Sequence, residues 1–125
     1  MAVEHAVFEG GYNGTGLEIK VETHHVTSAH HIQLHHLHFV DFSFQPALKV
    51  VSPPRLDVTL NISHLLYQEA YVADLHLEAR KMEVRGVVMS KGLASSMQIY
   101  PQSECGVEEV VVSDWGGMAL NISAF

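Results

Sequence analysis

Apolar and polar residues alternate strictly over several stretches of this chain, and this period of two limits its fold more than any other feature. The alternation is clearest in residues 17–24, 56–63 and 73–80, and it returns at residues 118–122. Successive side chains of an extended strand point to opposite faces, so the pattern predicts half-buried strands. We therefore predict a fold that is mainly β or α+β, with an antiparallel sheet of four to five strands and at most one packed helix, at about residues 101–115.

Two segments leave the choice between helix and strand open. Residues 63–83 have residue types that a helix also accepts, although the alternation from Tyr71 onward favours strand. In residues 101–115, Pro101 suits the first turn of a helix. Gly106 and three consecutive valines in the same segment favour strand instead. The secondary structure of residues 101–115 is therefore undecided.

The alternation also breaks at two places. Residues 31–44 carry apolar side chains on both parities, which suits a bulge or a strand that is buried on both faces. The phase flips near residues 80–81, which indicates either a tight hairpin or a bulge. Neither break interrupts the chain enough to predict a second domain.

The length of 125 residues predicts one domain, and a hydrophobic content of 47% provides for a buried core. Residues 1–15 contain several glycines and an Asn13-Gly14 turn signal, so we expect an irregular N-terminal arm there. Residues 16–125 are expected to form a single antiparallel β-rich domain.

The chain is acidic, with a formal net charge of -7 at pH 7 and only seven Lys and Arg residues, which are scattered. This balance argues against binding to nucleic acid or to an anionic membrane. The ten histidines would carry the net charge to about +3 if all were protonated. Histidine titrates at about pH 6.5, so this reversal is expected in mildly acidic solution.

Cys105 is the single cysteine, which excludes an internal disulfide and predicts a cytoplasmic protein, or a virion component if the role is structural. The N-terminus lacks the basic start and apolar run of a signal peptide, and no stretch has the length of a membrane helix. All three asparagines (Asn13, Asn61 and Asn121) lie in glycosylation sequons. Asn61 and Asn121 fall inside strand-like segments, so we expect the sequons to be unused.

Seven of the ten histidines fall between residues 24 and 38. Imidazole is a common ligand of zinc and nickel, so a metal site or a pH-responsive site is physically possible. No cysteine partner and no H-E-x-x-H spacing accompany these residues, and ordinary surface histidines with no bound cofactor are the expectation. The metal-ligand candidates are His24, His25, His30, His31, His36 and His38.

Sequence signatures of catalysis are absent. The chain has no G-x-S-x-G elbow, no phosphate-binding P-loop and no dinucleotide-binding glycine fingerprint. Cys105 next to Gly106 is an isolated thiol, which is more typical of an inert residue than of a nucleophile. We therefore expect a protein that is not an enzyme.

Several short segments, taken in order, resemble the SecB family of export chaperones. Residues 37–46, 54–60 and 71–77 are similar to its first three strands, residues 99–101 to the start of its main helix, and residues 117–123 to the segment after that helix. The sequence departs from the family after Pro101, where Gln-Ser-Glu-Cys replaces Tyr-Ala-Arg-Glu. The resemblance implies a four-stranded antiparallel sheet with a packed helix, a dimer of dimers, and capture of non-native polypeptide without ATP.

The expected function is therefore non-enzymatic protein binding, by a SecB-like holdase or by self-association into a homo-oligomer. One alternative is a structural β-domain of a larger assembly, such as a virion or surface-assembly protein, and another is a His-rich metal- or pH-responsive module. A helix in residues 101–115 would favour the chaperone, whereas a strand would favour a sandwich or barrel. The candidate binding residues, which are apolar groove or core positions, are Phe39, Phe42, Phe44, Tyr100 and Leu120.

Overall fold

The structure, a computed structural model, describes residues 1–21 and 29–123, and within these residues it contains strands and turns but no helix. None of the described residues forms a helix long and apolar enough to cross a membrane. The strands are β1 (Ala2–Gly11), β2 (Leu17–Lys20), β3 (His30–Phe42), β4 (Leu48–Val51), β5 (Val58–Ala70), β6 (Leu75–Gly92), β7 (Met97–Trp115) and β8 (Leu120–Ile122).

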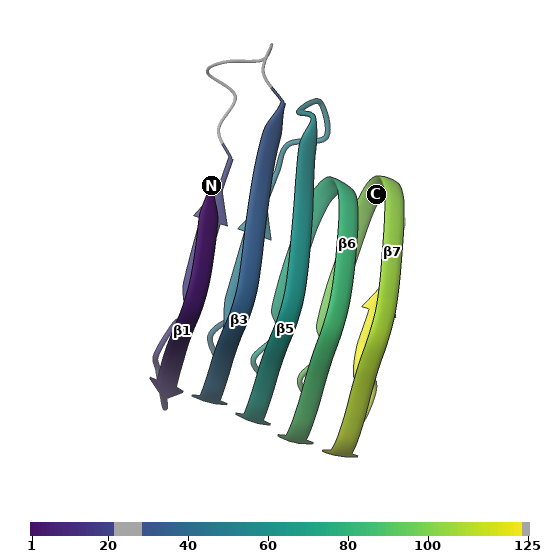
Figure 1. The fold of residues 1–125 in the computed structure, drawn as a ribbon. Coiled ribbons are helices and arrows are strands. Elements are labelled where there is room, and N and C mark those ends of the chain that lie inside the picture. The colour runs from purple at the N-terminus through teal and green to yellow at the C-terminus, as the bar shows by residue number, and fades with distance from the viewer. Residues whose placement is uncertain (22–28, 124–125) are drawn as a thin grey trace.

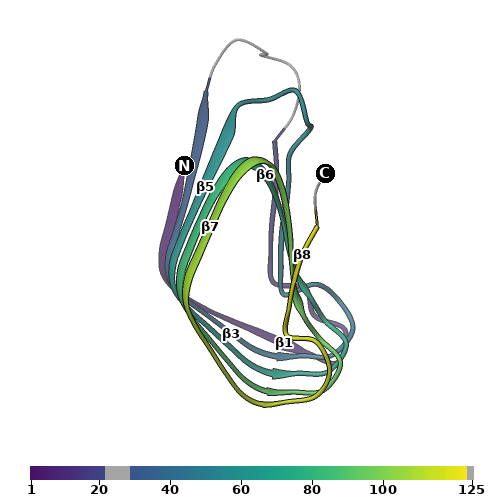
Figure 2. The same ribbon diagram turned by 90° about the vertical axis from the view of Figure 1, so that its right-hand side faces the viewer.

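All eight strands belong to one sheet, and every strand pair is parallel. The prediction of an antiparallel sheet of four to five strands with a packed helix is therefore wrong. In Figure 1, β1, β3, β5, β6 and β7 lie side by side on the near wall, and the chain returns along a second wall behind them. The chain winds as a right-handed coil (Figures 1 and 2), which defines a parallel β-solenoid.

The strand register divides the coil into five stacked turns, which we call rungs. Ala2 pairs with Gln33, Gln33 with Asn61, Asn61 with Glu83, and Glu83 with Gly106. The offsets between these partners are 31, 28, 22 and 23 residues. Because the repeat length is uneven, no fixed sequence period is visible, although each rung has the same structural role.

The near-wall strands bend at a first corner, visible at the lower left of Figure 2. The residue at this bend has a positive φ in every rung, and the register stacks these residues in one column: His5, His36, His64, Gly86 and Glu109. The left-handed conformation tolerates glycine best, and histidine is enriched there among other residues. We call this column the histidine corner.

A second column of positive-φ residues lies five residues further along four of the rungs. It consists of Asp41, Glu69, Lys91 and Asp114, with φ between 53° and 62°. Aspartate is another residue that the left-handed region favours. We call this column the acidic corner. Between the two corners each rung forms a short flat segment, and beyond the acidic corner the chain turns into the second wall.

The core lies inside the coil, where the inward-facing side chains of successive rungs stack. One such column runs through Phe39, Tyr67 and Met89, each 0% exposed, with the partly buried Phe8 stacked on Phe39. The buried Tyr67 hydroxyl donates a hydrogen bond of 2.6 Å to the Ala73 carbonyl. Burial raises the pKa of Tyr67 well above its ordinary value, so this hydroxyl stays protonated.

The structure also decides the segments that the sequence left open. Residues 2–11, expected in an irregular arm, form β1 and pair with β3. Residues 101–115 are strand in β7, and the phase flip near residues 80–81 is an irregularity within β6 rather than a hairpin. The apolar residues on both parities of residues 31–44 arise from the bend at His36, not from a strand buried on both faces.

Candidate functional site

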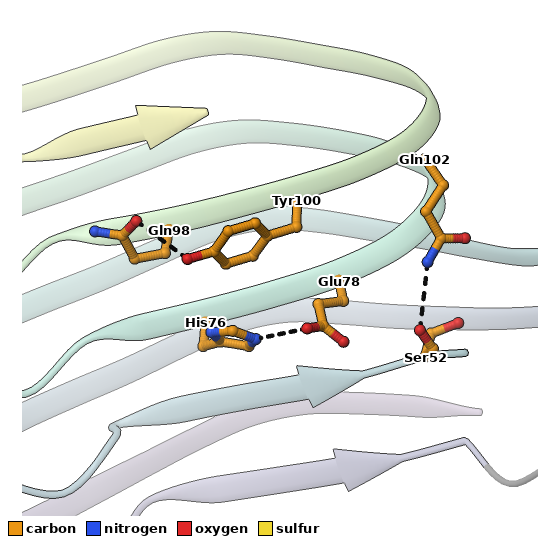
Figure 3. Close-up of polar contacts among 6 residues, drawn as sticks. All are labelled: Ser52, His76, Glu78, Gln98, Tyr100 and Gln102. Atoms are coloured by element: carbon orange, nitrogen blue, oxygen red, sulfur yellow. Dashed lines mark hydrogen bonds and ion pairs between the residues drawn. The ribbon is translucent and has the colours of Figure 1, made fainter. Parts of the chain in front are cut away.

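Polar side chains gather on the second wall, where β4, β6, β7 and β8 lie side by side (Figure 3). His76 Nε2 lies 3.1 Å from Glu78 Oε1, and the His76 ring lies 4.9 Å from the Tyr100 ring, centroid to centroid. The Tyr100 hydroxyl donates to Gln98 Oε1 over 3.4 Å. We call this surface the polar face.

Most side chains of the polar face pair with one another, although the buried Gln102 Oε1 has no hydrogen-bond partner. Asn121 Nδ2 donates to Gln98 Oε1 over 2.7 Å. Gln102 Nε2 donates to the Ser52 carbonyl over 3.3 Å (Figure 3). Half-buried polar groups that are already paired stabilise the wall, because leaving them unpaired would be costly. The hydrogen bonds of the polar face therefore tie neighbouring rungs together.

The Cys105 thiol and the His76–Glu78 pair do not form a catalytic arrangement, because Cys105 pairs with Met82 whereas His76 pairs with Gln98 further back along the same two strands. A carboxylate-oriented imidazole is typical of a general base, but a nucleophile must lie within its reach. Partial burial, followed by the charge of Glu83, raises the pKa of the Cys105 thiol. The thiol is therefore protonated at neutral pH and weakly nucleophilic.

Three imidazole rings stack on the histidine corner. His5 and His36 have ring centroids 4.7 Å apart at 6°, and His36 and His64 have centroids 4.6 Å apart at 7°. Reduced solvation of the ring, and then the neighbouring His64 and His5, lower the pKa of His36. His35, one residue before the corner, hydrogen-bonds to Ser63 in the next rung.

The predicted metal ligands do not converge. His30 is half-buried, His31 is exposed, and His38 Nε2 lies 3.0 Å from Gln68 Oε1. His24 and His25 lie outside the described residues. Within residues 1–21 and 29–123, no three His, Cys, Asp or Glu side chains are placed to hold a metal ion. Of the four candidates among the described residues, His36 alone joins a histidine cluster, and its partners His5 and His64 come from other rungs.

The stacked imidazoles predict a loss of stability in acid. The pKa of His36 is lower in the folded chain than its unfolded value of about 6.5, so the unfolded chain binds more protons as the pH falls below about 6.5. The thermal midpoint of dilute protein should therefore be lower at about pH 5.5 than at about pH 7.5. The variant His36→Asn should show a smaller drop, whereas His31→Asn, an exposed histidine outside the stack, should behave as the wild type. An equal drop in both variants would contradict the role of the stack.

Apolar side chains are exposed in the turns that follow the acidic corner. Tyr12, Phe44, Tyr71 and Val72 line a hollow of about 320 Å³ and are each between 51% and 71% exposed. The Tyr12 ring contacts Phe44 edge-on, with centroids 5.1 Å apart. The exposure of three aromatic residues in one place is unusual, because such rings are normally buried.

This hollow continues into a second one on the acidic corner. The second hollow has a volume of about 380 Å³, shares Tyr71, and is also lined by Leu93 and by all four corner residues, Asp41, Glu69, Lys91 and Asp114. Within the described part of the chain, none of these four charged side chains forms an ion pair. We call the two hollows together the corner groove. Its surface combines exposed aromatic rings with free charges, so it can accept a partly apolar ligand.

The candidate binding residues fall in different places. Phe39 and Phe42 are fully buried in the core, Tyr100 belongs to the polar face, and Leu120 is half-buried in β8. Phe44 is the one candidate that lies in the corner groove. The alternation did not indicate the other exposed apolar residues of the groove, Tyr12, Tyr71 and Val72, since they lie in turns rather than strands.

No protein-family model matches the chain, and neither a curated protein nor a solved structure does. The fold and the contacts of this chain therefore carry the functional argument. They define a parallel β-solenoid whose second wall is internally paired and whose corner groove is open.

Proposed function

We propose that this solenoid is a non-enzymatic protein-binding module that holds an extended segment of a partner protein in the corner groove. The observation that carries this proposal is the gathering of Tyr12, Phe44 and Tyr71, all more than half exposed, in one groove. Exposed aromatic side chains in a hollow are typical of the anchor points of protein interfaces. The groove crosses several rungs, which suits an extended chain better than a compact small molecule.

Peptide binding tests the proposal. Two fluorescein-labelled decapeptides serve as probes, one alternating Leu with Ser and one made only of Gly and Ser. We expect the apolar peptide to raise fluorescence anisotropy and the Gly-Ser peptide not to do so. Removing an aromatic anchor by Phe44→Ala or Tyr71→Ala should weaken binding about tenfold, which corresponds to about 1.4 kcal/mol.

The matched control is Ile122→Ala, which removes a 49% exposed apolar side chain from β8 on the second wall, outside the corner groove. This variant should bind the apolar peptide as the wild type does. Equal weakening by Phe44→Ala and Ile122→Ala, or no binding of the apolar peptide at millimolar concentration, would overturn the proposal. Suppression of client aggregation by the wild type, lost in Phe44→Ala, would extend the proposal to a holdase.

A structural role in a larger assembly is the second candidate. It is favoured by the stack of rungs, which makes a rod with flat walls (Figures 1 and 2). A module of this kind would associate through its flat surfaces and would not need the corner groove. The oligomeric state of the groove variants distinguishes the two roles, because a purely structural element keeps its assembly when Phe44 is replaced.

A further inference from the structure

An apolar stripe runs along the flat segments between the histidine corner and the acidic corner. One outward-facing side chain from each rung contributes to it, and the register stacks them in the order Val7, His38, Leu66, Val88 and Val111. Val7 is 65% exposed, Val88 40% and Val111 58%. Aligned valines on an exposed sheet face are unusual for a face that meets only water, since the outward side of a half-exposed strand is normally polar.

The two edges of this face differ in charge. One edge is the histidine corner with its stacked rings His5, His36 and His64, beside which lie His35, Glu4 and the ion pair of Arg85 with Glu109. The other edge is the acidic corner with Asp41, Glu69, Lys91 and Asp114, and Glu9 lies next to it in the first rung. The face therefore carries the apolar stripe next to the histidine corner and a mostly polar column next to the acidic corner, formed by Glu9, Val40, Gln68, Ser90 and Ser113. One edge of the face is titratable and the other is mainly acidic.

We propose that the apolar stripe docks against the same stripe of a second copy of this chain, with the two coils parallel and related by a two-fold axis along the coil direction. Such a rotation superimposes the rungs and exchanges the two edges of the face. It therefore sets each histidine corner against the acidic corner of the other copy. His36 then faces the partner's Asp41, and His64 faces the partner's Glu69. This charge complementarity, repeated on both edges, selects a second copy as the occupant.

The other charges fit the same arrangement. Gly86 lies opposite the partner's Lys91, so the fourth rung brings no like charges together. Glu109 lies opposite the partner's Asp114, but its carboxylate is already paired with Arg85 at 3.3 Å. A two-fold axis across the rungs would reverse their order, so His64 and Glu69 of the central rung would each meet their own copy, whereas Asp41 would meet the partner's Lys91. The charge exchange described below distinguishes the two arrangements, because it creates opposite charges only when the coils are parallel.

The size of the face predicts a weak dimer. Five rungs span roughly 24 Å, and the five residue steps from one corner to the other span roughly 17 Å, because strands lie about 4.8 Å apart and rise about 3.3 Å per residue. The face then measures roughly 400 Å² per copy, or roughly 800 Å² in total, below the roughly 1,200 Å² of a stable complex. A positive charge on the histidine corner would be attracted to the partner's acidic corner. The dimer should therefore form in mildly acidic solution.

Sedimentation equilibrium of the whole chain, at concentrations up to about 1 mM, tests this proposal. We expect a monomer–dimer equilibrium that is at least about tenfold tighter at about pH 5.5 than at about pH 8. Val88→Glu should abolish the dimer by placing two carboxylates at the apolar stripe. Ile122→Glu, in β8 on the second wall, should leave the dimer intact. A monomer at both pH values, or a dimer that survives Val88→Glu, overturns the proposal. A dimer of equal affinity at both pH values overturns the proposed pairing of the corners.

A charge exchange keeps the proposal testable if Val88→Glu fails to fold. Glu69→Lys alone should weaken the dimer at about pH 5.5, because it sets a lysine against the partner's His64. Adding His64→Glu should restore the dimer and make it form at about pH 8 as well, since both partners are then charged. Failure of the double variant to dimerise overturns the two-fold arrangement. Glu69 also lines the corner groove, so peptide binding of both variants is measured separately to distinguish a change in the groove from a change in the dimer.

Discussion

Replacement of Phe39 by alanine is expected to lower the free energy of unfolding by about 3–5 kcal/mol. Phe39 is 0% exposed, stacks on Phe8 with ring centroids 5.0 Å apart, and lies in the core column with Tyr67. A cavity at this position removes contacts in three successive rungs, since the column is continuous. The loss is large beside the 5–15 kcal/mol that typically stabilises a domain. Urea denaturation followed by circular dichroism measures it.

Phe44→Ala provides a control with identical chemistry at an exposed position. Phe44 is 51% exposed and lies in the corner groove, so its removal should change the free energy of unfolding by less than about 1 kcal/mol. If both variants lose similar stability, Phe39 does not occupy the continuous core described above.

Replacement of His36 by valine is expected to destabilise the fold by about 1–3 kcal/mol through the backbone alone. The φ of His36 is 54°, and a β-branched residue is a strong outlier in the left-handed region. The side chain of His36 is exposed, so lost burial contributes little. Thermal or urea denaturation at about pH 8, where the histidines are neutral, isolates the backbone effect.

His36→Asn is the matched comparison, because asparagine tolerates the left-handed conformation. Its stability at about pH 8 should lie within about 0.5 kcal/mol of the wild type. Equal destabilisation by valine and asparagine would show that the ring stack, rather than the backbone angle, maintains the corner. Equal stability of all three proteins would contradict the positive φ.

The sequence predicts the strands well at the level of single side chains. The alternation in residues 56–63 and 73–80 places Leu60, Ile62 and Leu77 on buried faces, and the structure buries all three. It does not reveal the direction of pairing, because a half-buried strand alternates in the same way in parallel and antiparallel sheets. The short motifs that resemble an export chaperone describe strand-like segments and carry no information on how those segments pair.

The corners explain why the coil is hidden in the sequence. A residue in the left-handed conformation turns the strand, so two consecutive side chains point outward and the parity of the apolar residues reverses. Each affected rung therefore reads apolar-polar-polar-apolar at the first corner, except that glycine takes one polar place. The five segments are Val3-Glu4-His5-Ala6, Leu34-His35-His36-Leu37, Ile62-Ser63-His64-Leu65, Val84-Arg85-Gly86-Val87 and Val107-Glu108-Glu109-Val110. Their alignment is the signal that identifies a coil whose offsets vary.

The local sequence also does not reveal which residues meet in the candidate surfaces. Local sequence singles out Phe44 as an aromatic residue but gives no reason to group it with Tyr12 and Tyr71, which are far apart in the chain. Likewise, the histidines between residues 24 and 38 attract attention as a run, whereas the stack is formed by His5, His36 and His64. Neighbours in a solenoid are set by the offset between rungs, so residues about 22 to 31 positions apart meet.

The uneven coil length has a consequence for engineering. Between β4 and β5 the chain leaves the wall and runs through Pro53 and Pro54, whereas β6 passes the equivalent place as a continuous strand with one irregularity between Ala79 and Lys81. The offset falls from 28 to 22 residues, yet the columns on both walls stay aligned. The length of this excursion therefore varies between rungs, although Leu56 within it is 1% exposed and packs in the core. Foreign sequence inserted beside Pro54 would be displayed outside the rod without disturbing the stacking, which makes this loop a natural grafting position for a reporter or an epitope.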